Sequence, residues 1–315
     1  MQEFSLIDWI RDQVGPGGSD VVLGIGDDAA VLDVPDGERL VVTSDTLGSG
    51  THFNSDDPPE TVGHKSLAVN LSDLAAMGAM PRWALLSLCL PAGMDAWTRA
   101  FIHGFLALAR SCNVRLVGGD ISSGSLCVGV TAMGSTREGR FLRRDGARPG
   151  DLVVVSGTLG DAAYALSELE DGRLPDSAVL ERLRLPLPRV GLGAALVGNA
   201  TACIDVSDGL LADLGHIAQA SALGAVVYVQ QLPASKALLD RPEDQRYALQ
   251  LTGGDDYELC FTWPGGKRES LRGLSGDQGL DLTVVGTMQV GDEVRCVDPN
   301  GRELAFKTRG YTHQL

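Results

Sequence analysis

Apolar residues recur at the spacing of an α-helix in several parts of the chain. Val62, Leu67, Leu71 and Leu74 lie on one helical face within residues 58–78, which open with two prolines and close with a glycine. This pattern predicts a long helix over residues 58–78. Further helices are predicted at residues 5–14, 96–111, 161–169, 190–198 and 210–222.

Short apolar runs bounded by glycine, aspartate or serine predict β-strands. They occur at residues 21–25, 29–34, 40–44, 83–90, 114–117, 126–133, 152–156, 202–206, 225–229 and 282–286. Because helices and strands mix in both halves, the predicted fold class is α/β or α+β. The turn-rich sequence R-D-G-A-R-P-G-D at residues 144–151 predicts a boundary between a domain of residues 1–148 and one of residues 149–315.

Composition narrows the possible partners. The 315 residues, 44% of them hydrophobic, suffice for two domains, and a net charge of −15 argues against bulk attraction to nucleic acid or to an anionic membrane. The six cysteines form no C-x-x-C pair and have no histidine at zinc-site spacing, so reduced thiols are expected. With no signal segment and no apolar run of membrane-spanning length, we expect a soluble, cytoplasmic protein.

Four short segments, at residues 24–28, 43–46, 118–120 and 204–209, each offer an aspartate carboxylate, and each is expected to follow or end a strand. Asp73 adds a carboxylate to a helix that is apolar around it. Turn and capping chemistry explains any one segment taken alone. If strand ends bring the segments together, however, their carboxylates repel one another unless cations neutralise them. Mg²⁺ suits such a site best when phosphates complete its shell.

This chemistry fits phosphoryl transfer, which needs positioning and neutralisation of charge more than covalent help from the protein. No residue stands out as an activated nucleophile, so we assign no catalytic side chain and attribute catalysis to positioning and metal electrostatics. Neither a Walker-type loop nor a protein-kinase motif set is present. An arginine of R-R-D-G, Arg143 or Arg144, is a candidate phosphate contact, and His52 is the one histidine close to a proposed segment.

The chain resembles the thiamine-monophosphate kinase family in order from Phe4 to Tyr311. The shared blocks are L-G-I-G-D-D-A-A-V-L, T-S-D-T-L-x-x-x-x-H-F, K-S-L-A-V-N-L-S-D-L-A-A-M-G-A, G-G-D, I-D-V-S-D-G-L-x-x-D-L-G-H-I and G-G-D-D-Y-E-L. The resemblance implies a two-domain fold like that of aminoimidazole-ribonucleotide synthetase and selenophosphate synthetase. Its N-terminal domain would bind ATP and Mg²⁺ and form a homodimer through its sheet.

The resemblance also implies the reaction. ATP would phosphorylate thiamine monophosphate to thiamine diphosphate by direct in-line transfer of its γ-phosphate, with no phosphoenzyme, as the last step of thiamine diphosphate biosynthesis. Several Mg²⁺ ions would assist, ATP would be the co-substrate, and neither nucleic acid nor a membrane would be a partner.

Site residues carry over from the family blocks position by position. The implied metal positions are Asp28, Thr43, Ser44, Asp45, Asp73, Asp120, Asp205 and Asp208. The implied ATP contacts are Gly119, Asp120, Arg144 and Ser207, and the implied substrate contacts are His52, Asp255 and Tyr311. Asp255 stands where glutamate is the family's commoner residue, and its shorter side chain can still accept a hydrogen bond from an aminopyrimidine through water. Tyr311 can stack on a cationic thiazolium ring.

Three other functions remain open at this point. Another ATP-dependent enzyme of the same superfamily, such as one making selenophosphate, would be expected to carry a lysine and a reactive cysteine near its N-terminus, whereas the first lysine here is Lys65 and the first cysteine Cys89. A two-metal phosphohydrolase would also use clustered acids. A non-catalytic cation-binding protein is the third alternative. Product analysis separates a kinase from a hydrolase, and ATP-dependent turnover would exclude the non-catalytic protein.

Overall fold

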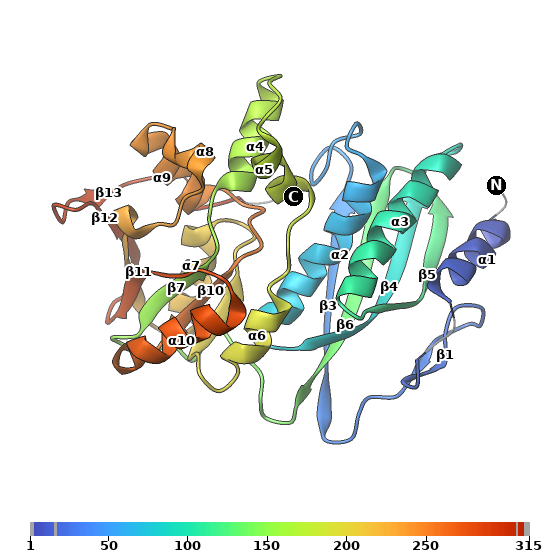
Figure 1. Cartoon of the computed structure of the whole chain (residues 1–315), viewed down its shortest axis with the longest axis horizontal. Coiled ribbons are helices and arrows are strands. Elements are labelled where there is room, and N and C mark those ends of the chain that lie inside the picture. The colour runs from blue at the N-terminus through green and yellow to red at the C-terminus, as the bar shows by residue number, and fades with distance from the viewer. Residues whose placement is uncertain (1–2, 16–17, 307, 312–315) are drawn as a thin grey trace. The chain divides into compact units, whose positions relative to one another are not determined.

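The computed structural model describes residues 3–15, 18–306 and 308–311. The chain forms two compact units, Met1–Leu74 with Ala79–Gly139, and Ala75–Gly78 with Arg140–Leu315 (Figure 1). The predicted boundary between residues 148 and 149 falls slightly later in the chain and stays a prediction. None of the helices in the described ranges has the length and apolarity needed to cross a lipid bilayer.

The first unit contains a four-stranded sheet in the order β3-β6-β4-β5, with helices α2 and α3 packed on one face (Figure 1). Strands β4 and β5 are parallel and are joined through α3, while β6 is antiparallel to both of its neighbours. The bounds are α1 Glu3–Val14, β1 Val21–Leu23, β2 Val31–Leu32, β3 Glu38–Gly48, α2 Pro59–Ala76, β4 Met80–Leu90, α3 Asp95–Ser111, β5 Arg115–Ser123 and β6 Cys127–Arg137.

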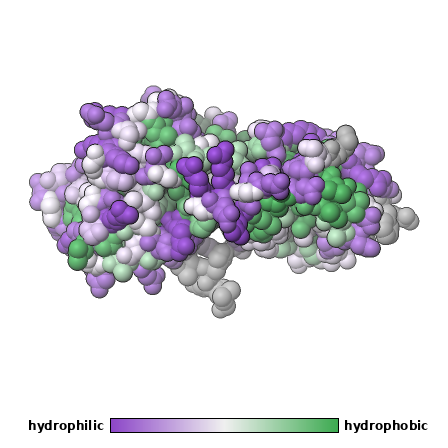
Figure 2. All heavy atoms as spheres, turned by 90° about the horizontal axis from the view of Figure 1, so that it is seen from below, coloured by the Kyte–Doolittle hydropathy of each residue, from purple (hydrophilic) through white to green (hydrophobic). Residues whose placement is uncertain are grey.

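Buried and more exposed side chains alternate along these strands, which distinguishes the covered face of the sheet from the open one. Leu86 of β4 pairs with Val130 of β6, and both are almost fully buried, as expected for the face under the helices. The opposite face is open in this chain and carries exposed Leu40 and Val42 of β3. Apolar surface of this unit is visible in Figure 2, and its exposed large apolar side chains include Val22, Leu23, Val31, Val34, Leu40, Val42 and Met80.

The second unit contains a mixed seven-stranded sheet in the order β13-β12-β9-β11-β7-β10-β8, with helices on both faces. Helix α7 packs on one face, and α6 with α10 pack on the other. The bounds are β7 Leu152–Ser156, α4 Asp161–Glu170, α5 Ser177–Arg184, α6 Val190–Leu196, β8 Ala202–Asp205, α7 Leu210–Ala220, β9 Gly224–Tyr228, α8 Lys236–Leu239, α9 Glu243–Thr252, β10 Leu259–Trp263, α10 Arg268–Gln278, β11 Leu282–Gln289, β12 Val294–Val297 and β13 Glu303–Leu304.

The predicted elements correspond to observed ones, with ends displaced by a few residues. The prediction missed α5, α8, α9, α10, β10, β12 and β13. Helices α9 and α10 have polar sequences, EDQRYALQLT and RESLRGLSGDQ, and a search for apolar residues passes over helices that contain so few of them. The expected reduced state of the cysteines agrees with the structure, in which all six are free and Cys203, Cys260 and Cys296 are buried.

Two of the four acidic segments do not end their strands, contrary to the expectation from sequence. Strand β3 continues to Gly48 and pairs with β6 along its whole length, so residues 43–46 lie inside it. Strand β5 likewise runs past residues 118–120 to Ser123. Backbone pairing continues through these polar residues because the hydrogen bonds between strands are made by main-chain groups and do not depend on the side chain.

Helices α2 and α3 approach each other at two glycines. A Cβ atom on Gly63 would lie 2.0 Å from the carbonyl oxygen of Phe101, and one on Gly104 would lie 1.9 Å from that of Glu60. These distances are far below van der Waals contact, so any side chain at either position would push the helices apart.

We therefore predict that Gly104→Ala lowers the free energy of unfolding by about 2–3 kcal/mol, because a methyl group cannot fit against the α2 backbone. The matched control is Gly273→Ala in α10, where an added Cβ has no neighbour within 4 Å. That control should be neutral or gain about 0.5–1 kcal/mol from helix propensity. Urea unfolding followed by circular dichroism measures both, and equal stability of the two variants would contradict the prediction.

Candidate functional site

The first group of predicted site residues lies where β3 meets α2. The Thr43 hydroxyl donates a hydrogen bond to Asp73 at 2.5 Å, which ties the strand to the helix. The backbone N–H of Asp45 donates to the amide oxygen of Asn70 at 3.1 Å, one turn earlier on α2. Asn70 is fully buried and also donates to the Ser66 carbonyl, so it is fixed from both sides.

Asp45 and Asp73 are close enough to influence each other's ionisation. Partial burial raises the pKa of Asp45 to about 6, and the Asp73 carboxylate adds to that rise through repulsion. A hard cation between these oxygens would relieve the repulsion and lower the pKa again. The donor set at this position therefore fits a divalent cation such as Mg²⁺.

The second group lies on the open face of the same unit. Asp28, Gly119 and Asp120 line a pocket of about 960 Å³, together with residues of α1 and of strands β4 and β6. Both carboxylates are exposed. Gly119 has a φ of 148°, and a Cβ there would lie 1.8 Å from the Leu86 carbonyl oxygen, so packing of β5 on β4 by itself requires glycine.

Strand order keeps the two groups apart within this unit. Asp45 lies on edge strand β3 and Asp120 on edge strand β5, three inter-strand steps away, or about 14 Å at the usual strand spacing. By register, Asp45 shares a face with buried Val130, whereas Asp120 is on the opposite face. In the part of the chain described, no three His, Cys, Asp or Glu side chains gather as around a single ion.

Ser44 and His52 complete the predicted residues of this unit. The Ser44 hydroxyl lies 3.2 Å from the Val130 carbonyl, to which it donates, and 3.0 Å from the Thr131 hydroxyl. His52 is half-buried in the loop after β3, and its Nδ1 accepts a hydrogen bond from the Gly48 N–H at 3.1 Å. That bond assigns the neutral ring the tautomer with its proton on Nε2.

In the second unit, Asp205, Ser207 and Asp208 lie at the end of edge strand β8 and in the turn into α7. Asp213, in the first turn of α7, organises this turn. One of its carboxylate oxygens accepts hydrogen bonds from the backbone N–H groups of residues 207, 208 and 209, at 3.0, 3.1 and 3.1 Å. These N–H groups would otherwise be unsatisfied at the start of a helix.

Burial raises the pKa of Asp213 to about 8, with further repulsion from Asp205 and then from Asp208. Three carboxylates therefore influence one another here, as two do beside α2. Oxygen donors under mutual repulsion suit a hard cation, so this turn also fits Mg²⁺.

The two predicted substrate residues of this unit are tied to the same turn. Asp255 donates its backbone N–H to the Ser207 carbonyl at 2.8 Å, and Tyr311 donates its own to the Asp208 carbonyl at 2.9 Å. The structure thus brings together three segments that lie far apart in sequence, namely residues 205–208, Asp255 and Tyr311.

The two candidate arginines differ in their side-chain contacts. Arg143 is paired with Asp145 through two hydrogen bonds, at 2.7 and 2.5 Å. Arg144 is exposed, and its guanidinium has no ion pair with any described residue. Arg143 would have to break this pair in order to bind a phosphate, whereas Arg144 would not, so the assignment of Arg144 as a phosphate contact stays a prediction.

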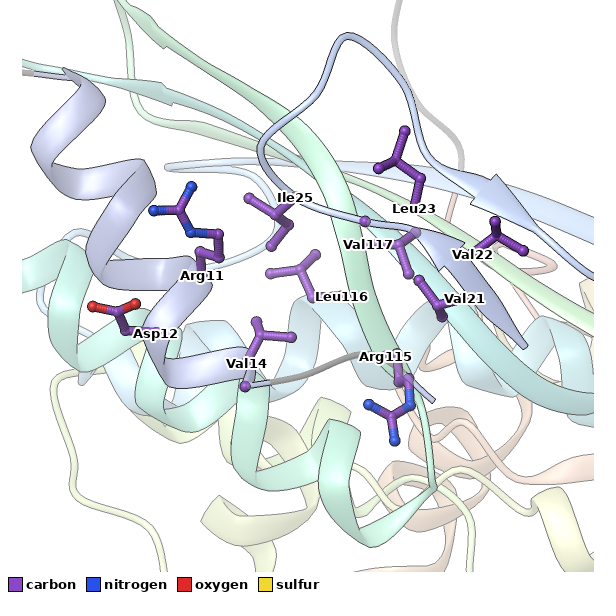
Figure 3. A pocket seen from close by; sticks show the side chains of 12 residues that line it. Arg11, Asp12, Val14, Val21, Val22, Leu23, Ile25, Arg115, Leu116 and Val117 are labelled. Atoms are coloured by element: carbon purple, nitrogen blue, oxygen red, sulfur yellow. The ribbon is translucent and has the colours of Figure 1, made fainter. Parts of the chain in front are cut away.

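Sequence reasoning did not single out Asn70, Asp213 or Tyr257. The spacing S-D-G-x-x-x-D was a usable signal for Asp213, because an acid in the first helical turn often satisfies free N–H groups. Outside the predicted residues, a pocket of about 540 Å³ lies between α1, β1 and β5. Val14, Ile25 and Leu116 point into it, with Arg11 and Arg115 on either side (Figure 3).

Asp213→Ala should lower the free energy of unfolding by about 2–3 kcal/mol in metal-free buffer, because three N–H groups lose their acceptor. Asp213→Asn should lose less, since an amide oxygen still accepts. Exposed Asp277 of α10 provides the control Asp277→Ala, expected to stay within about 0.5 kcal/mol of the parent. Urea unfolding measures all three, and wild-type stability of Asp213→Ala would show that Asp213 does not hold the turn.

Three comparisons identify relatives. The family models for AIR synthase related protein match residues 26–136 with the N-terminal domain and residues 148–298 with the C-terminal domain. Thiamine-monophosphate kinase of Salmonella typhimurium is 42% identical over 318 residues, covering 99% of this chain and 98% of that protein.

Two solved structures agree with this relationship. That of thiamine-monophosphate kinase from Stenotrophomonas maltophilia K279a is 47% identical with a TM-score of 0.88, covering 94% of this chain and 96% of the other. AaThiL complexed with AMPPCP and TMP is 33% identical with a TM-score of 0.78, covering 99% and 97%. The fold is therefore the two-domain AIR synthase-like fold, and the chain belongs to the thiamine-monophosphate kinase family.

Proposed function

We propose that this chain transfers the γ-phosphate of ATP to thiamine monophosphate and forms thiamine diphosphate, the last step in making that coenzyme. The observation that carries the proposal is near-full-length similarity to thiamine-monophosphate kinases. A relative was solved with AMPPCP, an ATP analogue, and TMP. The backbone contacts of Asp255 with Ser207 and of Tyr311 with Asp208 support the same function, because residues proposed for the nucleotide, the metal and the substrate then lie close together.

The carboxylates are proposed to hold Mg²⁺. Asp45 and Asp73, with Thr43 and Ser44 nearby, offer one oxygen-donor set, Asp28 and Asp120 a second, and Asp205 and Asp208 a third. When bound, Mg²⁺ would neutralise the triphosphate oxygens and the developing charge on the transferred group. This electrostatic role, with several ions, needs no catalytic side chain.

The remaining residues position the two substrates. Gly119, Asp120 and Ser207 are proposed to meet ATP, and Arg144 offers a guanidinium that can bind phosphate oxygens in a bidentate manner. His52, Asp255 and Tyr311 are proposed to meet thiamine monophosphate. The acceptor phosphate is already an anion near neutral pH, so proton removal by a general base is unnecessary.

We further propose a homodimer formed through the sheet of the first unit. Its open face carries exposed Leu40 and Val42, and exposed Val22 and Val31 lie on the neighbouring hairpin of β1 and β2. Contiguous exposed apolar side chains of this kind mark protein–protein contacts.

The defining experiment incubates purified protein with ATP, Mg²⁺ and thiamine monophosphate and separates the products by chromatography. We expect ADP and thiamine diphosphate in equal amounts. Asp205→Asn should lower kcat at least about 100-fold because it removes a charge that neutralises the transition state through the metal. Release of inorganic phosphate instead would identify a phosphohydrolase, and no turnover would leave a cation-binding protein.

Tyr311→Ala should raise KM for thiamine monophosphate about tenfold, because it removes a ring that can stack on the thiazolium cation. The KM for ATP should change less than twofold. Tyr311→Phe keeps the ring and the backbone N–H that contacts Asp208, so it should behave like the parent. Equal effects of Tyr311→Ala on both substrates would remove Tyr311 from a stacking role.

A further inference from the structure

The segment Gly254–Glu258 has an unusual backbone. Asp255 has a φ of 67° and Tyr257 a φ of 50°. Both values lie in the left-handed region, which residues other than glycine rarely adopt. Each such residue costs of order 1 kcal/mol or more, so it persists only when surrounding contacts determine the conformation. The segment is therefore held against an intrinsic preference for other conformations.

Backbone contacts bind this segment to the turn that carries Asp205 and Asp208. Asp255 and Tyr257 donate their N–H groups to the carbonyls of Ser207 and Val206, both at 2.8 Å, and Val206 donates to the Glu258 carbonyl at 2.8 Å. A Cβ on Gly254 would lie 2.4 Å from the Ser207 carbonyl oxygen, so the two backbones run in close contact.

Buried ionic contacts fasten the same segment from the other side. The Asp256 carboxylate, almost fully buried, accepts the Gly160 N–H at 2.8 and 3.0 Å. The fully buried Glu258 carboxylate pairs with Arg182 at 2.7 Å and with Arg189. These contacts leave Asp256 and Glu258 facing inward, while Asp255 and Tyr257 remain half-buried.

Asp255 and Tyr257 alternate with the inward-facing Asp256 and Glu258, and their side chains meet. The Tyr257 hydroxyl donates a hydrogen bond to Asp255 Oδ1 at 3.0 Å. A hydroxyl bonded to one carboxylate oxygen restricts the rotation of an aspartate side chain and so fixes the direction of its carboxylate.

We infer that Tyr257 is a positioning residue, whose hydroxyl orients the Asp255 carboxylate toward the aminopyrimidine of thiamine monophosphate. This inference rests on the proposed substrate role of Asp255. The hydrogen bond forms on a backbone in which both residues have positive φ, held by the contacts described above. Tyr257 itself touches neither ATP nor the reacting phosphate in this role.

Tyr257→Phe is the direct test, because it removes the hydroxyl and keeps the ring and the backbone. We expect KM for thiamine monophosphate to rise about five- to tenfold, as for loss of a hydrogen bond to a charged group. The kcat at saturating substrate and KM for ATP should stay within about twofold. Tyr228→Phe, at the half-buried end of β9, is the control and should match the parent. An unchanged KM for thiamine monophosphate in Tyr257→Phe overturns the inference.

A double-mutant cycle separates positioning from a general effect on the fold. In an Asp255→Ala background, Tyr257→Phe should change KM for thiamine monophosphate no further, because the hydroxyl then has no carboxylate to orient. A rise as large as in the parent background overturns the inference. If Asp255→Ala alone leaves KM unchanged, the proposed substrate role of Asp255 fails, which is distinct from a failure of Tyr257 to orient it.

Discussion

Repulsion between neighbouring carboxylates is the constraint around which both units are organised. Burial raises the pKa of Asp45 and of Asp213, and repulsion from Asp73 in the one case and from Asp205 and Asp208 in the other raises it further. A protein that only needed stability would not place acids so close together in partly buried positions. These groups make physical sense when divalent cations share their oxygens, which is also what two anionic substrates require in order to react.

The two units hold their acids by different means. In the first, side chains from a helix and an edge strand meet, with Thr43 donating to Asp73 and Asn70 receiving the Asp45 N–H. In the second, the acids lie on a turn whose N–H groups are gathered by Asp213. The first arrangement depends on helix α2 packing on the sheet, which the glycine contacts between α2 and α3 make possible. The second depends mainly on local capping chemistry.

Strain in the segment Gly254–Glu258 is offset by contacts that have no part in chemistry. Glu258, Arg182 and Arg189 form a buried ion cluster whose effect is to hold the backbone where Asp255 and Tyr257 take left-handed conformations. Breaking such a buried pair leaves an unpaired charge, so the cluster resists rearrangement. Rigid support of this kind is what a substrate contact on a loop needs to remain in one orientation.

The sequence by itself determined the family, the substrates that the family implies and the residue blocks that carry the acids, because a motif is recognised from the order of its residues alone. Most helices and strands followed from apolar periodicity, while polar α9 and α10 did not. Only the tertiary structure decided that Thr43–Thr46 lies inside β3 and that Asp45 and Asp120 occupy opposite edges and faces of one sheet. It also decided that Arg143 pairs with Asp145, whereas no residue in the described ranges forms an ion pair with Arg144. It also decided that Tyr257 meets Asp255. Strand partners and left-handed backbone conformations are set by contacts between residues distant in the chain, and no local pattern encodes them.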